Sequence, residues 1–134
     1  MICVGKVCSI DPAHCTVRVI FEDRSNLVSY DLPVLVQQTK INKDFYMPDV
    51  GEHVVCVFLD NGSEQGFVLG AFYSKEDRVS SVVNSEKRRI DFGDGSWLEF
   101  DRSTGAYIVH ITGDFVIESE KHGVIKASRL DLNP

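Results

Sequence analysis

Four carboxylates lie close together in the second half of the chain, interspersed with glycines, a combination that suits a calcium ion. They are Asp91, Asp94, Glu99 and Asp101, and they surround Gly93 and Gly95. Calcium takes oxygen ligands, but the spacing of these residues is not that of an EF-hand loop. Asp and Gly are also common turn residues, because Asp accepts local backbone hydrogen bonds and Gly tolerates positive φ. Turns explain this acidic set more simply, and we expect no bound metal.

Cysteines and histidines are the other candidates for chemistry. The four cysteines are Cys3, Cys8, Cys15 and Cys56. They lack Cys-x-x-Cys spacing, although His14 and His53 are near enough in sequence to join them around zinc. The favoured interpretation is that they are free thiols, which serve as small buried apolar side chains in a reducing compartment. His110 and His122 are scattered, and no nucleophile motif is present. We therefore expect neither a cofactor nor an enzyme.

Composition is that of an ordinary globular chain with enough apolar residues for one modest core. Of its 134 residues, 43% are hydrophobic and 25% are charged. The opening MICVGKVCSI has no basic region and no long apolar run, so we expect no signal peptide or membrane span and folding in a cytoplasm. The net charge of −6 argues against a nucleic-acid partner, because phosphate binding needs clustered Lys and Arg.

The first half of the chain shows the alternation of apolar and polar residues that is typical of strands. We predict strands at residues 2–10, 16–22, 27–36 (interrupted by Pro33), 53–59 and 66–73. The last two flank Asn61-Gly62, which is a strong hairpin turn signal. No helical periodicity of useful length appears. This count favours an OB-fold-like Greek-key barrel over residues 1–73, followed by a polar linker over 74–89.

Apolar residues recur every eight positions through the last third of the chain. This octad column consists of Phe92, Phe100, Ile108, Val116, Val124 and Leu132. Glycines interrupt the run, and β-branched residues between them suit short strands. A period of eight matches neither a helical face nor a plain hairpin meander, but it matches a strand plus a turn repeated as a solenoid. The alternative is an ordinary antiparallel sheet whose turns are evenly spaced.

Such a thin repeat has no second layer within one chain, so it needs partners. Three identical chains intertwined around a threefold axis would bury the strands and remove their exposed edges. Alternation places one set of small or apolar residues on a common face, which we predict to be the core of a trimeric β-helix. This set is Val109, Ile111, Ile117, Ile125 and Ala127. The overall prediction is an all-β chain with a short intertwined trimeric β-helix over residues 90–134.

Several segments together resemble the phage baseplate assembly protein V family, whose members are central spikes of contractile tails and are related to type VI secretion spikes. They are GKV at 5–7, ID at 10–11, PDVGE at 48–52, VVCVFL at 54–59, NG at 61–62, GFVLGAFY at 66–73, DGS at 94–96 and FDR at 100–102. The resemblance spans nearly the whole chain and implies an OB-fold barrel followed by a trimeric β-helix. Unlike some members, this chain has no His-x-His iron-binding apex and no lysozyme domain.

The resemblance implies a structural homotrimer that docks on a tail hub protein and pierces the target cell envelope when the sheath contracts. The expected location is the baseplate of a phage, tailocin or related injection particle, assembled in the bacterial cytoplasm. Because the repeat ends without a metal-binding apex, we expect a separate PAAR-like tip protein to contact Leu130 and Leu132. An alternative is an OB-fold binding module for oligosaccharide or single-stranded nucleic acid, which would need an exposed aromatic and basic face.

Overall fold

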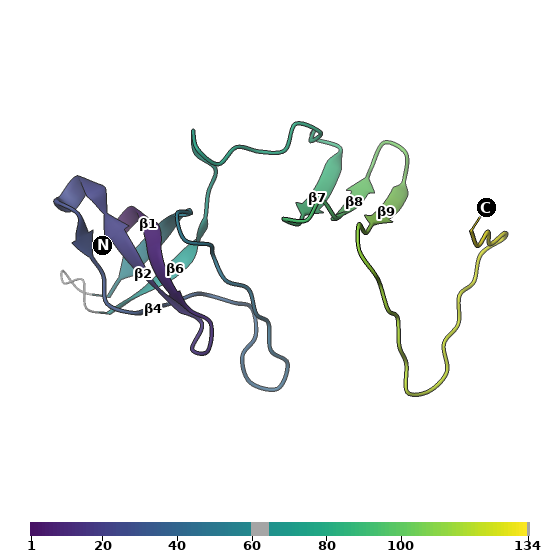
Figure 1. Ribbon diagram of the computed structural model, residues 1–134, viewed down its shortest axis with the longest axis horizontal. Coiled ribbons are helices and arrows are strands. Elements are labelled where there is room, and N and C mark those ends of the chain that lie inside the picture. The colour runs from purple at the N-terminus through teal and green to yellow at the C-terminus, as the bar shows by residue number, and fades with distance from the viewer. Residues whose placement is uncertain (60–64, 134) are drawn as a thin grey trace. The chain divides into compact units, whose positions relative to one another are not determined.

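The chain is all-β, as predicted, and divides into two compact units, Met1–Val79 and Ser80–Pro134. The structure is a computed structural model that describes residues 1–59 and 65–133 (Figure 1). Within these ranges no residue is α-helical, and the one short helix is a 3-10 turn, η1, at Glu22–Arg24. No described helix has the length and hydropathy that a membrane crossing requires. The predicted Asn61-Gly62 turn lies outside the described residues.

The first unit is a sheet of six strands, and its order along the sheet is β3-β2-β1-β5-β6, with β4 also paired to β2. The strands are β1 (Ile2–Asp11), β2 (Thr16–Phe21), β3 (Leu27–Val28), β4 (Leu32–Pro33), β5 (His53–Phe58) and β6 (Gly66–Ala71). All of these pairs are antiparallel, with Cys3 opposite Cys56 and Val57 opposite Phe67. Four of the five predicted strands therefore correspond to single strands of the structure.

The core of this unit is made by alternate residues of the sheet, as period-two burial requires. Its members are Cys3, Val7, Val17, Val19, Phe21, Leu32, Val34, Val54, Cys56, Phe58 and Val68. Phe21 and Phe58 meet edge to face, with ring centroids 5.8 Å apart. Gly5 faces the same interior, where a Cβ atom would lie 2.6 Å from Val19 Cγ1. Glycine at this position leaves the space that atoms of the neighbouring strand β2 occupy.

The predicted strand over residues 27–36 is wrong in extent, because the chain leaves the sheet between β3 and β4. Ser29 is buried there, and its Oγ accepts a hydrogen bond from Val19 N at 2.9 Å. Pro33 then ends β4, since it has no amide hydrogen to continue a ladder. Beyond it, one parallel bridge joins Val34 to Val68, and Leu35 N donates to Val68 O at 3.1 Å. The two ends of the curled sheet thus meet at a single bridge, and the sheet is not a closed barrel.

The second unit contains a three-stranded antiparallel meander, β7 (Lys87–Asp91), β8 (Trp97–Asp101) and β9 (Ala106–His110). Its first strand starts inside the stretch 74–89 that the sequence presents as a polar linker. The two hairpin turns contain Gly95 with φ +92° and Gly105 with φ +72°, conformations that other residues rarely adopt. Residues 111–133 follow β9 and lie in none of the described strands (Figure 1).

Candidate functional site

The acidic residues that resembled a calcium loop are turn and ion-pair residues in the structure. The Asp94 carboxylate accepts hydrogen bonds from Ser96 N at 2.9 Å, Ser96 Oγ at 3.0 Å and Thr112 Oγ1 at 3.1 Å. These bonds favour the charged form and lower the pKa of Asp94, with the Ser96 amide contributing most. Asp101 accepts from Ser103 Oγ at 2.6 Å and Ser103 N at 2.9 Å, which lowers its pKa in the same way.

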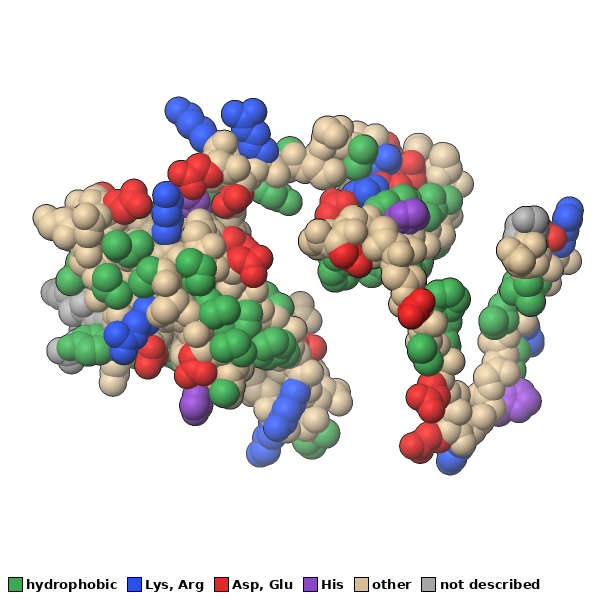
Figure 2. Space-filling model, viewed as in Figure 1, with side chains coloured by type: hydrophobic (Ala, Val, Ile, Leu, Met, Phe, Trp, Pro, Cys, Tyr) green, Lys and Arg blue, Asp and Glu red, His purple; other side chains and the backbone are tan. Residues whose placement is uncertain are grey.

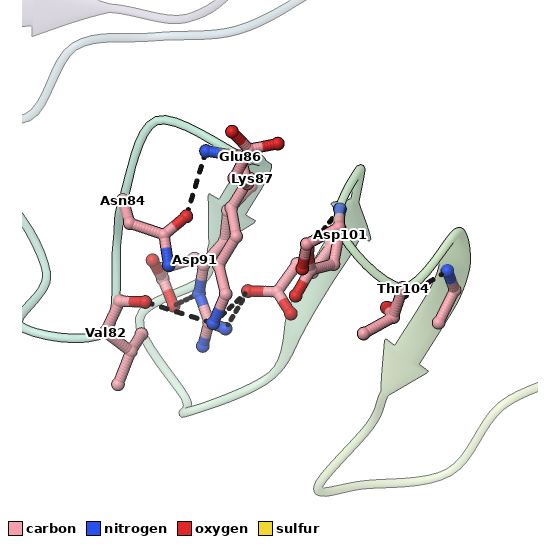
Figure 3. Close-up of polar contacts among 11 residues, drawn as sticks. Val82, Asn84, Glu86, Lys87, Asp91, Asp101 and Thr104 are labelled. Atoms are coloured by element: carbon pink, nitrogen blue, oxygen red, sulfur yellow. Dashed lines mark hydrogen bonds and ion pairs between the residues drawn. The ribbon is translucent and has the colours of Figure 1, made fainter.

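The other two carboxylates of this set, Asp91 and Glu99, bind Arg89. Arg89 Nη1 lies 2.9 Å from Glu99 Oε1, and Arg89 Nε lies 3.0 Å from Asp91 Oδ1. Lys87 Nζ lies 3.5 Å from the same Glu99 oxygen and also donates to Val82 O at 3.2 Å (Figure 3). The hydrogen bond to Glu99 is the largest cause of the raised Arg89 pKa. Across residues 1–59 and 65–133, no three His, Cys, Asp or Glu side chains gather as a metal site would require.

One face of the β7–β9 sheet is polar, and we call it the polar face. It carries Lys87, Arg89, Trp97, Glu99, Ile108 and His110. The Arg89 guanidinium lies 4.2 Å from the centroid of the Trp97 ring, close enough for a cation–π interaction. The His110 ring stacks on Trp97 with a centroid separation of 5.4 Å. The Glu99 side chain is only 6% exposed and that of Arg89 11%, so this cluster is largely buried within one chain.

The opposite face of the same sheet is mostly apolar and exposed, and we call it the apolar face. It carries Arg88, Ile90, Leu98, Phe100, Tyr107 and Val109. Phe100 and Tyr107 stack at 4.5 Å, which is the only aromatic pair of the described residues on this face. Tyr107 is 81% exposed and Val109 63%. In the sequence this face corresponds to the alternate apolar residues Leu98 with Phe100 and Tyr107 with Val109, a period of two that differs from the octad spacing.

The octad column does not form a single face in this sheet. Phe100 lies on the apolar face, whereas Ile108, eight residues later, lies on the polar face opposite Glu99. The reason is the register of the β8–β9 hairpin, which pairs Phe100 with Tyr107. Even-numbered residues of β8 therefore share a face with odd-numbered residues of β9. Two residues that are eight positions apart, one on each strand, consequently lie on opposite faces of the sheet. Phe92 lies in the β7–β8 turn, where its amide donates to Ser96 O at 2.8 Å.

The remaining predicted interface residues lie in the extended segment 111–133 and are all exposed within one chain. They are Ile111, Val116, Ile117, Val124, Ile125, Ala127, Leu130 and Leu132. Exposure reaches 88% at Ile117, 82% at Val116 and 81% at Leu132. None of the backbone–backbone hydrogen bonds of the described residues involves this segment. Whether these side chains form a trimer core stays a prediction.

The four cysteines are free thiols, as predicted, but only two of them fit the interpretation of buried apolar side chains. Cys3 and Cys56 are buried opposite each other on β1 and β5, whereas Cys8 is exposed and Cys15 is half-buried. Burial raises the pKa of Cys56 to about 11, with a smaller contribution from Cys3. Among the described residues, His14 and His53 do not form a zinc site with these thiols.

A hollow of about 700 Å³ in the first unit was not foreseen from the sequence. Its lining includes the carboxylates Asp49, Glu52, Glu76 and Asp77 together with Phe72 and Tyr73. The acidic groups come from the loop before β5 and the stretch after β6, which are far apart in the sequence. No Lys or Arg lies among its lining residues. A phosphate-rich ligand such as single-stranded nucleic acid needs cationic contacts, so this hollow does not favour the binding-module alternative.

No model of a known protein family matches the chain, and a search of curated proteins found no match.

Proposed function

We propose that this chain is a structural, non-enzymatic subunit of a homotrimeric spike at the centre of a contractile-tail baseplate. The single observation that carries the proposal is the segment 111–133, in which apolar side chains are exposed and no backbone–backbone hydrogen bond is made. Backbone donors and acceptors that are not paired with other groups must be solvated, and apolar side chains gain from leaving water. Strand pairing with other copies satisfies both needs at once.

The number of copies follows from the shape of the repeat. Two chains would leave two open strand edges, whereas three chains around an axis close the structure on itself. In this arrangement the predicted core residues Val109, Ile111, Ile117, Ile125 and Ala127 face the threefold axis. Segment 111–133 then forms the intertwined β-helix. The curled sheet of the first unit, whose ends meet at Val34 and Val68, supports an OB-type barrel as the base of the spike.

The proposed mechanism is mechanical. The barrels dock on a hub protein at the end of the tail tube, and sheath contraction drives the β-rod into the target cell envelope. Hydrogen bonds between chains run along the whole rod, so that load is shared by many bonds of modest individual strength. The acidic net charge and the sequence resemblance to baseplate spikes are consistent with a particle component rather than a nucleic-acid binder.

At the distal end we propose a separate PAAR-like tip protein as a partner. Leu130 and Leu132 are 55% and 81% exposed, and threefold symmetry would gather three copies of each into an apolar landing ring. Removing residues 128–134 should abolish copurification of the tip protein when it is coexpressed, while the trimer stays intact. Retention of the partner by the shortened chain would refute this contact.

The proposed function is tested by the mass of the folded protein in solution. Light scattering coupled to size exclusion should give three times the mass of one chain, and the trimer should withstand detergent and mild heating. Amide hydrogen exchange should show segment 111–133 protected in the assembled protein, although one chain offers these amides no backbone partner. A folded monomer at micromolar concentration, with this segment exchanging freely, would refute the proposal.

A further inference from the structure

We propose that the apolar face of the β7–β9 sheet, defined above, is buried against the same face of two other copies, while the polar face points outward. This inference rests on the proposed trimer and extends its interface beyond the octads to the whole three-stranded sheet. It names Ile90, Leu98, Phe100 and Tyr107 as interface residues, of which only Phe100 belongs to the octad column.

The polar face has no need of a partner, because its charges are already matched within one chain. Glu99 is held by Arg89 at 2.9 Å and by Lys87 at 3.5 Å, and Trp97 lies between the Arg89 guanidinium and the His110 ring. Figure 2 shows acidic, basic and histidine side chains gathered over this sheet. Bringing three such ion clusters together around an axis would strip them of their remaining water without adding partners.

The apolar face, by contrast, leaves apolar side chains exposed to solvent within one chain. Ile90 is 55% exposed, Val109 63% and Tyr107 81%, whereas Leu98 is 39% exposed and Phe100 half-buried, so a large part of this face stays uncovered within the chain. Its one charged residue, Arg88, lies on the outer strand β7 and is exposed, where a long side chain can reach solvent past an apolar contact.

We infer that two other copies of this chain cover the apolar face, because the apolar residues of this face are followed in the sequence by those of the proposed trimer core. Tyr107 and Val109 on β9 point to the apolar face. β9 ends at His110, but once the following segment pairs as strands in the proposed trimer, alternation would place Ile111, Phe115 and Ile117 on the same side of the chain. The sheet face and the proposed trimer core therefore share one side of the chain, with Gly113 between Ile111 and Phe115, and with Ser119, Lys121 and Gly123 between Ile117 and Ile125. Copies that pair with the segment after His110 are in place to cover the sheet face that precedes it.

This arrangement places Phe100 inside the trimer and Ile108 outside it, although both belong to the octad column. Leu98 and Ile108 then form a matched pair for a test. They lie on neighbouring strands of one sheet, on opposite faces, and are 39% and 41% exposed within one chain. A polar substitution at either site costs the single chain about the same, so a difference in assembly reports which face is buried between copies.

The experiment compares Leu98→Gln with Ile108→Gln by light scattering and native mass spectrometry over a range of protein concentrations. We expect Leu98→Gln to raise the concentration at which half of the chains are trimeric by about tenfold or more, because three unpaired amides are buried per trimer. Ile108→Gln should change it by less than about threefold. Tyr107→Glu provides a second variant at a site so exposed that the fold of one chain does not depend on burying it, and it should act like Leu98→Gln.

The outcomes separate this inference from the function on which it rests. A monomeric wild-type protein refutes the trimer and the inference together. A trimeric wild-type protein that is disrupted by Ile108→Gln and not by Leu98→Gln or Tyr107→Glu refutes the inference alone. Equal effects of the substitutions on the two faces also refute it, because the sheet would then present no preferred face to the other copies.

Discussion

Replacing Gly5 by Ala should destabilise the first unit, and the structure supplies the size of the effect. A Cβ atom at this position would lie 2.6 Å from Val19 Cγ1 and 2.7 Å from the Ile20 carbonyl oxygen. The second neighbour is backbone of the paired strand β2 and cannot move alone. Overpacking of this kind typically costs about 1–3 kcal/mol, which corresponds to a roughly 5- to 150-fold larger unfolded fraction.

Cys56 provides the assay for this change. Its thiol is fully buried on β5, and burial raises its pKa to about 11, so it reacts with thiol reagents only when the first unit opens. Brief labelling across a urea series, followed by peptide mass spectrometry, gives the fraction of chains with Cys56 accessible. The midpoint for Gly5→Ala should move to lower urea, and the exposed Cys8 should be labelled at all concentrations.

Gly70→Ala is the matched control. Gly70 lies in β6 of the same sheet, and a Cβ atom there would meet nothing within 4 Å. Its substitution should leave stability within about 0.5 kcal/mol or raise it slightly, because alanine reduces the conformational freedom of the unfolded chain. If Gly5→Ala and Gly70→Ala shift the labelling midpoint equally, the close approach of β1 and β2 at Gly5 does not limit the fold as argued.

Three further predictions concern the second unit, the proposed trimer and the thiols. Ile117→Asp should lower the melting temperature of the trimer strongly because it places three carboxylates near one axis, whereas Glu118→Gln should have little effect; equal shifts would contradict the proposed inward face. The pKa of Asp94 is lowered by folding, so its contribution to stability is present above its unfolded value of about 4 and is lost as the pH falls through the folded value. The melting temperature of Asp94→Asn should therefore depend less on pH in this acidic range than that of the wild type. Identical dependence of the two melting temperatures on pH would show that Asp94 does not contribute to stability in this way. Freshly purified, denatured protein should release four free thiols, with Cys56 the slowest to react before denaturation, and a lower count would indicate a disulfide.

The strands of the first unit were predictable because one side of each strand is buried and the other is not. Val17, Val19 and Phe21 alternate with Thr16, Arg18 and Glu22, and this alternation located β2 to within one residue although Ile20 interrupts it. The break between β3 and β4 was not predictable, because it depends on the Ser29 hydroxyl accepting a hydrogen bond from the Val19 amide of the neighbouring strand. A contact of that kind has no periodic signature in the sequence.

The candidate site was only partly accessible to sequence reasoning. Apolar residues such as Ile117 and Ile125 were predicted from their spacing to form a trimer core, which stays a prediction, and the structure leaves them exposed within one chain. The sequence did not predict which residues of β8 and β9 lie on the same face of the sheet. That is set by the register of the hairpin, in which Phe100 pairs with Tyr107. The Arg89–Glu99 pair was missed for the same reason: ten residues apart in sequence, these side chains meet only because Arg89 and Glu99 are opposite each other in the β7–β8 pairing.

The position of Trp97 gives the second unit an optical signal of its own. It is the only tryptophan of the chain, and it lies between the Arg89 guanidinium at 4.2 Å and the His110 ring at 5.4 Å. Excitation selective for indole therefore follows the meander without interference from the first unit, whose aromatic residues are tyrosines and phenylalanines. Loss of the stacked surroundings on unfolding should change the emission of this single tryptophan, so that the melting of the second unit can be followed apart from that of the first in one unlabelled sample.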